Sequence, residues 1–571
     1  MKIQLVYPNF IEARIHAEEV AAVPMGLYSV AAVLIEAGHE VSVFNWYDSP
    51  PDPDALKTHL VKTRPDLIGF SILCANRWGG IDIARRVNEW VPGIRIVFGG
   101  VGATFLWTHL LTHFPEIDFV VVGEGETSFP ALVQALENGH PSAIEEIAGI
   151  AFSKSGPPVF TGPAAPVPDL DRLPDPAQYF TFQHLSLTRG CPSDCNFCGS
   201  PRLWGRRVRF HSADFFVGQI ARLYEKGVRF FYFSDDTFTL KKSLVIDVCQ
   251  KIVERKLDIS WNAISRVDAV DGQILSAMRR AGCIQISYGI ESGSEKIRKR
   301  LGKSLDEKKI ETAFALTTSF GILPRAYFIY GCPGDSEATV DQTLALMEKI
   351  KPLAAIFYIL DIFPGTALYD DYLVRTGAGD DIWGERIEDI LYFETDPDLS
   401  KEAVLAWGKQ LREAFYQRLP EYARSVELVD DPEFFALHAD FLSRLALTFD
   451  QGDYANISGM PEREKTAEDL YRRALSYAPD ARAFLGLGMI FQRRSDFFSS
   501  IEILSRGLKD FPRNEPLHIC LAVSLMNTGD FAKALGHLMP FEHNPQALSF
   551  AAACHRALGD EGAARACEKR L

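Results

Sequence analysis

Three cysteines lie close together in the run Arg189–Cys198 (RGCPSDCNFC), directly after the apolar segment His184–Thr188. Three thiolates on one short loop can hold three irons of a 4Fe–4S cluster, which leaves the fourth iron open to a small molecule. The alternative is a structural zinc site, which needs a fourth ligand, usually from a second Cys-x-x-Cys pair. The sequence has no second pair of that kind, so we expect Cys191, Cys195 and Cys198 to bind iron.

This C-x₃-C-x₂-C spacing, the strand before it and the aromatic Phe197 resemble the radical S-adenosylmethionine (SAM) superfamily. The resemblance implies that the open iron takes the amino and carboxylate groups of SAM, and that Phe197 packs near its adenine. It also implies an electron donor for the cluster, a reductant such as flavodoxin or ferredoxin.

The first 140 residues alternate apolar strand-like runs with helical segments. The expected strands are 2–7, 40–44, 66–72, 95–100 and 118–126. Alternation with nearly continuous apolar strands predicts a doubly wound, Rossmann-like parallel sheet, an α/β fold. Ligands of such sheets bind beyond the carboxyl ends of the strands.

Glycine-rich phrases end the fourth and fifth strands, at 99–102 and 123–127. Together with the cysteine loop, they resemble the cobalamin-binding domain of cobalamin-dependent radical SAM enzymes. The resemblance implies cobalamin contacts at Pro8, Asn9, Ser71, Gly99, Gly100, Gly123, Glu124 and Gly125. No D-x-H-x-x-G motif is present, so no histidine is marked as a lower ligand of cobalt. The alternative is a sheet of this kind that binds no cofactor.

Strand and helix alternate again from residue 182 to 395. The expected strands are 184–189, 230–234, 259–265, 284–289, 324–330 and 356–362. Six repeats predict a partial (β/α)₆ barrel that is open on one side. Functional side chains of parallel barrels collect at the carboxyl ends of the strands.

Polar side chains end the second, third and fourth of these strands. Asp235 and Asp236 can accept hydrogen bonds from an ammonium group, and Arg266 can pair with a carboxylate through two parallel bonds. By the resemblance, these residues hold the amino acid end of SAM, and Glu291 and Ser292 reach its ribose and methionine. The alternatives are a helix cap at the aspartates and an ion pair between them and Arg266.

Cys332 ends the fifth strand, in the turn Gly331–Asp335. A thiol in that position could return a hydrogen atom to a substrate radical, which makes Cys332 the candidate catalytic residue. The alternative is a turn residue without that role.

The strand signal ends after about residue 400. Ser495-Asp496-Phe497 and Gly529-Asp530-Phe531 lie 34 residues apart, each before a helical stretch. This period resembles tetratricopeptide helix hairpins. Such stacks form concave docking surfaces, so a protein partner is one hypothesis, and a structural cap or a dimer contact is the other.

Charge and composition exclude several function classes. The net charge of −15 weighs against nucleic acid as a partner. The sequence has no apolar run of about 18 residues, so no transmembrane helix is expected. Seven of the ten cysteines are scattered outside the loop, which fits a reducing cytoplasm.

We therefore predict five segments. They are a Rossmann-like cobalamin domain (1–140), a linker (141–181), a radical SAM domain (182–395), a helical connector (396–465) and an all-α domain of tetratricopeptide-like repeats (466–571).

The predicted function is that of a cytoplasmic, cobalamin-dependent radical SAM methyltransferase. By the resemblance, a 5′-deoxyadenosyl radical abstracts hydrogen from an unactivated carbon of a small-molecule, lipid or peptide substrate, and methylcobalamin donates the methyl group. One alternative is a cobalamin-binding radical SAM cyclase or ring-rearranging enzyme without net methyl transfer. Another is a non-catalytic scaffold whose helical repeats bind a partner.

Overall fold

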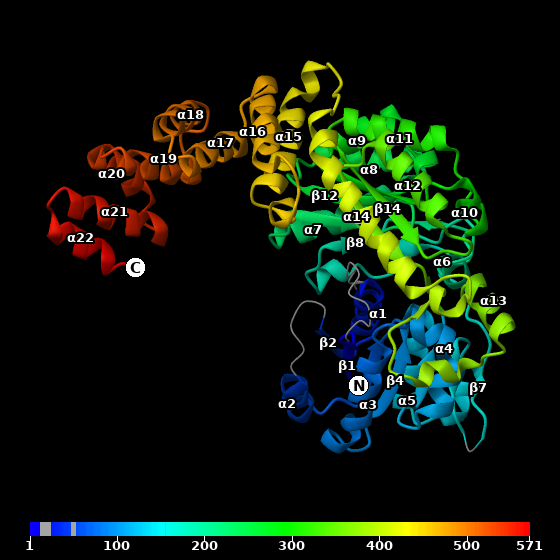
Figure 1. The fold of residues 1–571 in the computed structure, drawn as a ribbon. Coiled ribbons are helices and arrows are strands. Elements are labelled where there is room, and N and C mark those ends of the chain that lie inside the picture. The colour runs from blue at the N-terminus through cyan, green and yellow to red at the C-terminus, as the bar shows by residue number, and fades with distance from the viewer. Residues whose placement is uncertain (12–23, 47–52, 155) are drawn as a thin grey trace. The chain divides into compact units, whose positions relative to one another are not determined.

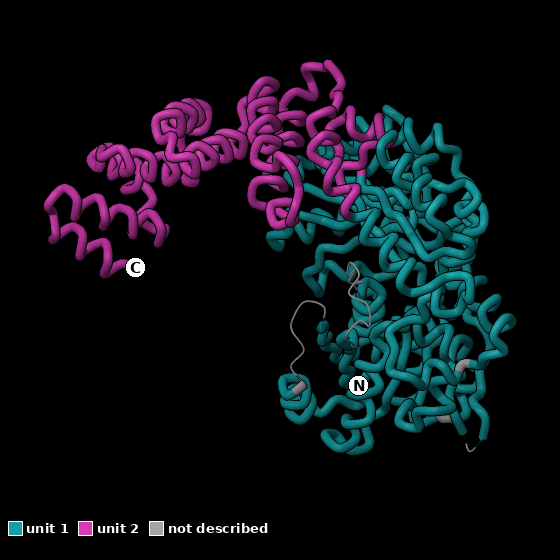
Figure 2. The backbone as a smooth tube through the Cα atoms, in the orientation of Figure 1, with its two compact units in different colours: residues 1–313, 325–349, 355–412 teal, residues 314–324, 350–354, 413–571 magenta. Residues whose placement is uncertain are grey.

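The computed structural model describes residues 1–11, 24–46, 53–154 and 156–571. The chain forms two compact units, coloured teal and magenta in Figure 2. Unit 1 comprises residues 1–313, 325–349 and 355–412, and unit 2 comprises residues 314–324, 350–354 and 413–571. In the described residues, no helix is long and apolar enough to cross a membrane.

The N-terminal part of unit 1 is built on a seven-stranded sheet (blue to cyan in Figure 1). Its strands are β1 (Lys2–Tyr7), β2 (Glu40–Asn45), β3 (Leu67–Ser71), β4 (Arg95–Gly99), β5 (Phe119–Val121), β6 (Ile150–Phe152) and β7 (Val159–Phe160). The strand order is β2-β1-β3-β4-β5-β6-β7, with the first five strands parallel and the last two antiparallel. The order 2-1-3-4-5 is one of the two common doubly wound arrangements, which confirms the Rossmann-like prediction.

Helices cover both faces of this sheet, which explains its nearly continuous apolar strands. They are α1 (Met25–Glu36), α2 (Pro53–Thr63), α3 (Arg77–Trp90), α4 (Gly100–His113) and α5 (Gly125–Glu137). Side chains of α1 and α5, such as Leu27 and Leu132, pack with Ile3 and Leu5 of β1. On α3, Gly80 lies directly against Phe98 of β4.

A six-stranded sheet forms the centre of the second half of unit 1. Its strands are β8 (His184–Leu185), β11 (Phe230–Phe233), β12 (Ser260–Ser265), β13 (Cys283–Glu291), β14 (Leu323–Tyr330) and β15 (Ala354–Ile359). They lie in the order β15-β14-β13-β12-β11-β8, as expected of a partial (β/α)₆ barrel.

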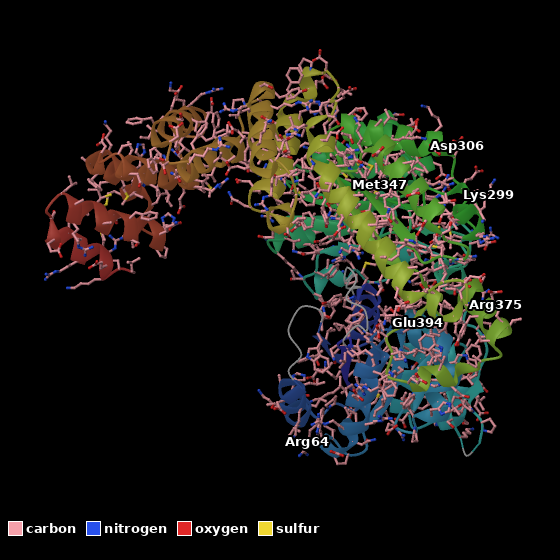
Figure 3. All side chains as sticks on the ribbon, viewed as in Figure 1. Arg64, Lys299, Asp306, Met347, Arg375 and Glu394 are labelled. Carbon is pink, nitrogen blue, oxygen red and sulfur yellow. The ribbon has the colours of Figure 1, made fainter. Side chains whose placement is uncertain are left out.

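Alternate side chains of these strands are buried against the flanking helices. Those helices are α7 (Ala213–Glu225), α8 (Lys242–Glu254), α9 (Gly272–Arg280), α11 (Glu307–Ser319) and α12 (Glu337–Ile350). Trp261 of β12 stacks on Phe233 of β11 with ring centroids 4.5 Å apart. Met347 on α12, marked in Figure 3, is likewise buried.

The expected strand 184–189 is broken in the structure. After β8, the chain leaves the sheet, and β9 (Thr188–Arg189) pairs antiparallel with β10 (Arg209–Phe210). The cause is the buried Asp235, whose carboxylate accepts hydrogen bonds from the amides of Leu187 and Thr188. This turn brings the cysteine loop across the end of the sheet.

Unit 2 is helical, and its last helices follow a regular pattern. They are α16 (Arg463–Tyr477), α17 (Ala481–Arg493), α18 (Phe497–Asp510), α19 (Glu515–Asn527), α20 (Phe531–Leu538), α21 (Pro545–Ala557) and α22 (Glu561–Glu568). From α17 on, each begins at an Asp or Asn whose side chain accepts a first-turn amide: Asp480, Asp496, Asn514, Asp530, Asn544 and Asp560. The repeated motif around Asp496 and Asp530 therefore marks corresponding helix starts.

Candidate functional site

The cysteine loop is fastened to the turn that follows α10 (Glu295–Arg300). The Asn196 amide donates to Leu301 O at 3.2 Å, and its side chain donates to Arg300 O at 2.7 Å. At Gly302, which has a φ of +70°, an added Cβ would lie 2.7 Å from Asp194 O. Only glycine allows this approach, so the loop conformation depends on residues that lie about 100 positions later.

All three cysteines of the loop are free and half-buried. Burial raises the pKa of the Cys198 thiol to about 11, and it also raises the pKa of Cys195, against the charges of Lys303 and Arg266. Three soft sulfur donors on one partly exposed loop suit an iron–sulfur cluster. Within the described residues, no three His, Cys, Asp or Glu side chains are gathered around a common point. The cysteines therefore fit the cluster by the chemistry of their sulfur donors and by their place on one loop.

The adjacent Asp235 and Asp236 have different environments. Asp235 is fully buried, and its carboxylate accepts hydrogen bonds from the amides of Leu187 and Thr188, at 3.2 and 2.6 Å. Burial raises its pKa to about 6. Asp236 accepts from Ser200 Oγ at 2.5 Å and lines a cavity. Of the two predicted SAM contacts, only Asp236 faces open space, whereas Asp235 holds the start of the cysteine loop.

Arg266 is tied to the cysteine loop directly. Its Nη1 donates to Ser193 Oγ at 2.9 Å, while Nε and Nη2 pair with both oxygens of Asp268, each at 2.9 Å. The ion-pair alternative was therefore correct in kind, but the carboxylate is that of Asp268 and not of the two adjacent aspartates. The predicted SAM contact of Arg266 stays a prediction.

Glu291 sits at the end of β13 with a φ of +64°, a conformation that non-glycine residues rarely adopt. Its carboxylate forms a buried ion pair with Lys303 Nζ at 2.5 Å. Strained backbone of this kind is concentrated at functional sites. We did not predict a role for Lys303, because a single lysine after a helix is usually a solvated surface residue.

Ser292 and Cys332 are buried in turns. Ser292 Oγ accepts from the Ser294 amide at 3.1 Å. The Cys332 thiol is fully buried and donates to Ile329 O at 3.6 Å, and burial raises its pKa well above the usual value. These surroundings favour the turn role of Cys332 over hydrogen-atom return. Phe197 lies half-buried on the cysteine loop.

A half-open cavity of about 1140 Å³, counting the solvent space at its mouth, lies at the carboxyl ends of the parallel strands in the N-terminal sheet. Six of the eight predicted cobalamin contacts line it: Ser71, Gly99, Gly100, Gly123, Glu124 and Gly125. Pro8 and Asn9 do not. Pro8 O accepts a hydrogen bond from Asn76, and Asn9 O lies where a Cβ on Gly79 would be. Packing against α3 thus takes both residues away from this cavity.

The walls of this cavity fit a large, flat ligand. An added Cβ on Gly26 would meet no atom within 4 Å, and one on Gly99 would meet none closer than 3.8 Å. The absence of side chains there therefore leaves open space that a cofactor can fill. Apolar side chains such as Val97 and Phe129 form much of the remaining wall, as in most cofactor sites.

A second half-open cavity, of about 930 Å³ counting the solvent space at its mouth, lies beside the start of the cysteine loop. Its lining residues include Gly190, Ser234 and Asp236, and aromatic rings cover much of the rest: Tyr28, Phe182, His184, Trp204, His211 and Phe215. Met25, Gly26, Arg189 and Trp204 line both cavities. The two cavities therefore share one wall next to the cysteine loop.

The His184 ring in this second cavity is expected to stay neutral. It stacks on Tyr232 at 4.3 Å, and burial lowers its pKa to about 4. Between the unfolded pKa of about 6.5 and the folded value, only the unfolded chain takes up this proton, so stability decreases as the pH falls.

We predict that His184→Phe reduces this pH dependence. The unfolding free energy of the wild type should fall more between about pH 7 and about pH 5 than that of the variant. The difference should be about 1 kcal/mol after allowance for partial exposure. Urea denaturation at both pH values measures it, and equal losses in the two proteins would contradict the assignment.

Two family models match the chain. The radical SAM superfamily matches residues 185–347, and the B12 binding domain matches residues 19–133. An uncharacterized methyltransferase of Pyrococcus horikoshii is 30% identical over 382 residues, which cover 65% of this chain and 83% of that protein. An anaerobic magnesium-protoporphyrin IX monomethyl ester cyclase of Synechocystis is 29% identical over 58% of this chain and 68% of that protein.

Two solved structures share the fold. The radical SAM methyltransferase TsrM of Kitasatospora setae, with cobalamin and a [4Fe-4S] cluster bound, has a TM-score of 0.61 at 17% identity, covering 84% of this chain and 99% of that one. The cobalamin-dependent SAM radical enzyme OxsB has a TM-score of 0.55 at 18% identity, covering 98% of this chain and 84% of that one.

Proposed function

The chain belongs to the cobalamin-dependent radical SAM enzymes, and from this premise we propose that it is a methyltransferase acting on an unactivated carbon. Its cofactors are a 4Fe–4S cluster, SAM and cobalamin. The observation that carries the proposal is the shared wall: one cavity opens at the cysteine loop, the other at the strand ends of the N-terminal sheet, and four residues line both.

Cys191, Cys195 and Cys198 are the proposed cluster ligands. When bound, the cluster and SAM supply a 5′-deoxyadenosyl radical and cobalamin supplies a methyl group. Asp236 faces the cavity beside the cysteine loop and can accept hydrogen bonds from the amino group of SAM. Arg266 orients the loop through Ser193, and the Glu291–Lys303 pair holds charge close to Cys195.

We place the substrate in the second cavity, beside the cysteine loop, where many of the lining residues are aromatic. Two stacked ring pairs line it, Tyr28 with Phe182 and His211 with Phe215, together with the His184 ring. Such walls exclude water and hold an apolar or conjugated group by its faces. Water exclusion matters because a reactive radical must meet its substrate carbon before it meets another hydrogen donor. The proposed substrate is a small molecule, a lipid or a peptide that carries such a group.

A second candidate function is a cyclase or ring-rearranging reaction without net methyl transfer. The similarity to the Synechocystis cyclase favours it. The cysteine loop and both cavities would serve either reaction, since both need a substrate radical.

The surroundings of the enzyme form part of the same proposal. A flavodoxin or ferredoxin donates the electron in the cytoplasm, and the helical repeats bind a protein partner. The proposed segments are 1–140, 141–181, 182–395, 396–465 and 466–571. The β6–β7 hairpin, which completes the N-terminal sheet, lies within the second of them.

The products formed from SAM test the function. Anaerobically reconstituted protein with cobalamin, SAM and a reductant should release 5′-deoxyadenosine, and it should also release S-adenosylhomocysteine as SAM transfers its methyl group to the reduced cobalamin. A methyltransferase consumes SAM in both ways, whereas the cyclase alternative yields 5′-deoxyadenosine without S-adenosylhomocysteine. If neither product forms, both candidate functions are contradicted.

A further inference from the structure

A buried ion network joins the cobalamin cavity to the cysteine loop. Glu124, directly before α5, and Glu126, in its first turn, are only 9% and 7% exposed. Arg189 Nη2 donates to Glu126 Oε1 at 2.5 Å, and Ser29 Oγ donates to the same oxygen at 2.8 Å. Arg209 pairs with both oxygens of Glu124. The network thus connects α1 and the start of α5 with the antiparallel pair β9–β10.

The position of Arg189 relates this network to both cofactor sites. Arg189 precedes Cys191 by two residues and lines both cavities. Its guanidinium also lies 5.3 Å from the ring centroid of Trp204, another residue of the shared wall. Glu124 and Glu126 line only the cobalamin cavity of the two. A movement of either carboxylate therefore reaches the cysteine loop through one side chain.

Buried charges of this kind resist rearrangement. A guanidinium holds a carboxylate in a fixed orientation through directional bonds, and separating such a pair inside the protein leaves an uncompensated charge. The start of α5 and the residues before Cys191 are therefore constrained to move together.

We propose that Arg189 is a positioning residue that couples cobalamin binding to the geometry of the cluster loop, through its ion pair with Glu126. This inference rests on the proposed function, because it needs both cofactors in one chain. Coupling of this kind is reciprocal: an ordered cluster loop strengthens cobalamin binding by the factor by which cobalamin favours the ordered loop. Assembly of the cluster would thereby prepare the cobalamin site.

A second ion pair serves as a matched control, because it also joins the two halves of unit 1 but lies away from both cavities. Arg386 pairs with both oxygens of Asp82 on α3, at 3.0 and 2.7 Å. This pair also links the N-terminal sheet region with a segment that follows the second sheet. It is largely exposed and lines neither cavity.

The test compares cobalamin dissociation constants with and without the cluster. Hydroxocobalamin binding is measured by equilibrium dialysis on anaerobically reconstituted protein and on the cluster-free Cys195→Ala chain. Each background carries, in turn, the wild-type network, Arg189→Gln, Glu126→Gln or Arg386→Gln. The wild-type network should bind cobalamin at least about 5-fold more tightly when the cluster is present. Arg386→Gln should retain that ratio.

With Arg189→Gln or Glu126→Gln, the ratio should fall to about one, whatever the absolute affinities. If Arg189→Gln does not fold, Glu126→Gln decides the question, since it removes the charge but keeps the shape. The inference would be overturned, without harm to the proposed function, by either of two results. One is an affinity ratio in the folded network variants as large as in the wild type, and the other is a wild-type chain that binds cobalamin equally well with and without the cluster. A wild-type chain that takes up no cobalamin would instead overturn the proposed function.

Discussion

Replacing Cys195 with alanine is expected to lower the yield of 5′-deoxyadenosine from SAM by more than about 100-fold, since losing even an outer partner of a metal ligand can cost that much. Two thiolates on the loop cannot hold three irons, so the open iron that binds SAM is lost with the third ligand. The measurement is 5′-deoxyadenosine released under anaerobic conditions with SAM and a reductant, together with iron content.

The control is Cys567→Ala in the last helix, where the thiol is also mostly buried but lies in unit 2. This variant should bind iron and cleave SAM as the wild type does. If Cys195→Ala kept its iron and cleaved SAM at the wild-type rate, the cluster assignment would fail.

A bulky side chain in the cobalamin cavity should weaken cobalamin binding and leave SAM cleavage at the cluster unchanged. Gly99 has extended backbone, with φ −153° and ψ −173°, so a larger residue fits the chain without backbone strain. Its Cβ would face the open space of the cavity. We expect Gly99→Phe to weaken cobalamin binding by about 10- to 100-fold, the effect of overpacking a well-formed site.

Cleavage of SAM to 5′-deoxyadenosine should survive in Gly99→Phe, because the cysteine loop is untouched. Gly536→Phe is the matched control, since Gly536 is exposed on α20 and an added Cβ would meet nothing within 4 Å. Cobalamin titration followed by its absorbance measures the affinity. Equal affinities in Gly99→Phe and the wild type would place cobalamin elsewhere.

Periodic patterns made the fold predictable from the sequence. The apolar runs of β1, β3 and β4 match their strands within a residue or two, because burial on both faces leaves a continuous apolar signature. The glycines at 99, 100 and 123 marked the cavity because they lie at or just after the carboxyl ends of β4 and β5. The break after β8 was not predictable, because Asp235 causes it from 47 or more residues away.

The site was predictable where one segment carries the chemistry. The cysteine loop and the segment Gly123–Glu126 (GEGE) could be recognised from the spacing of their residues. Residues that act through distant partners gave no signal: Lys303 pairs with Glu291, which lies 12 positions earlier on the other side of α10, and Arg189 pairs with Glu126 from 63 positions away. The sequence suggested cobalamin contacts for Pro8 and Asn9 because they follow β1, but it does not reveal their packing against α3.

The central claim is that a single chain holds an iron–sulfur cluster and cobalamin in neighbouring cavities. Metal analysis tests it most directly: protein reconstituted anaerobically with iron, sulfide and hydroxocobalamin is freed of unbound cofactor by gel filtration, and its iron and cobalt are counted. The account predicts about four irons and about one cobalt per chain. Iron without cobalt, or cobalt without iron, would contradict it.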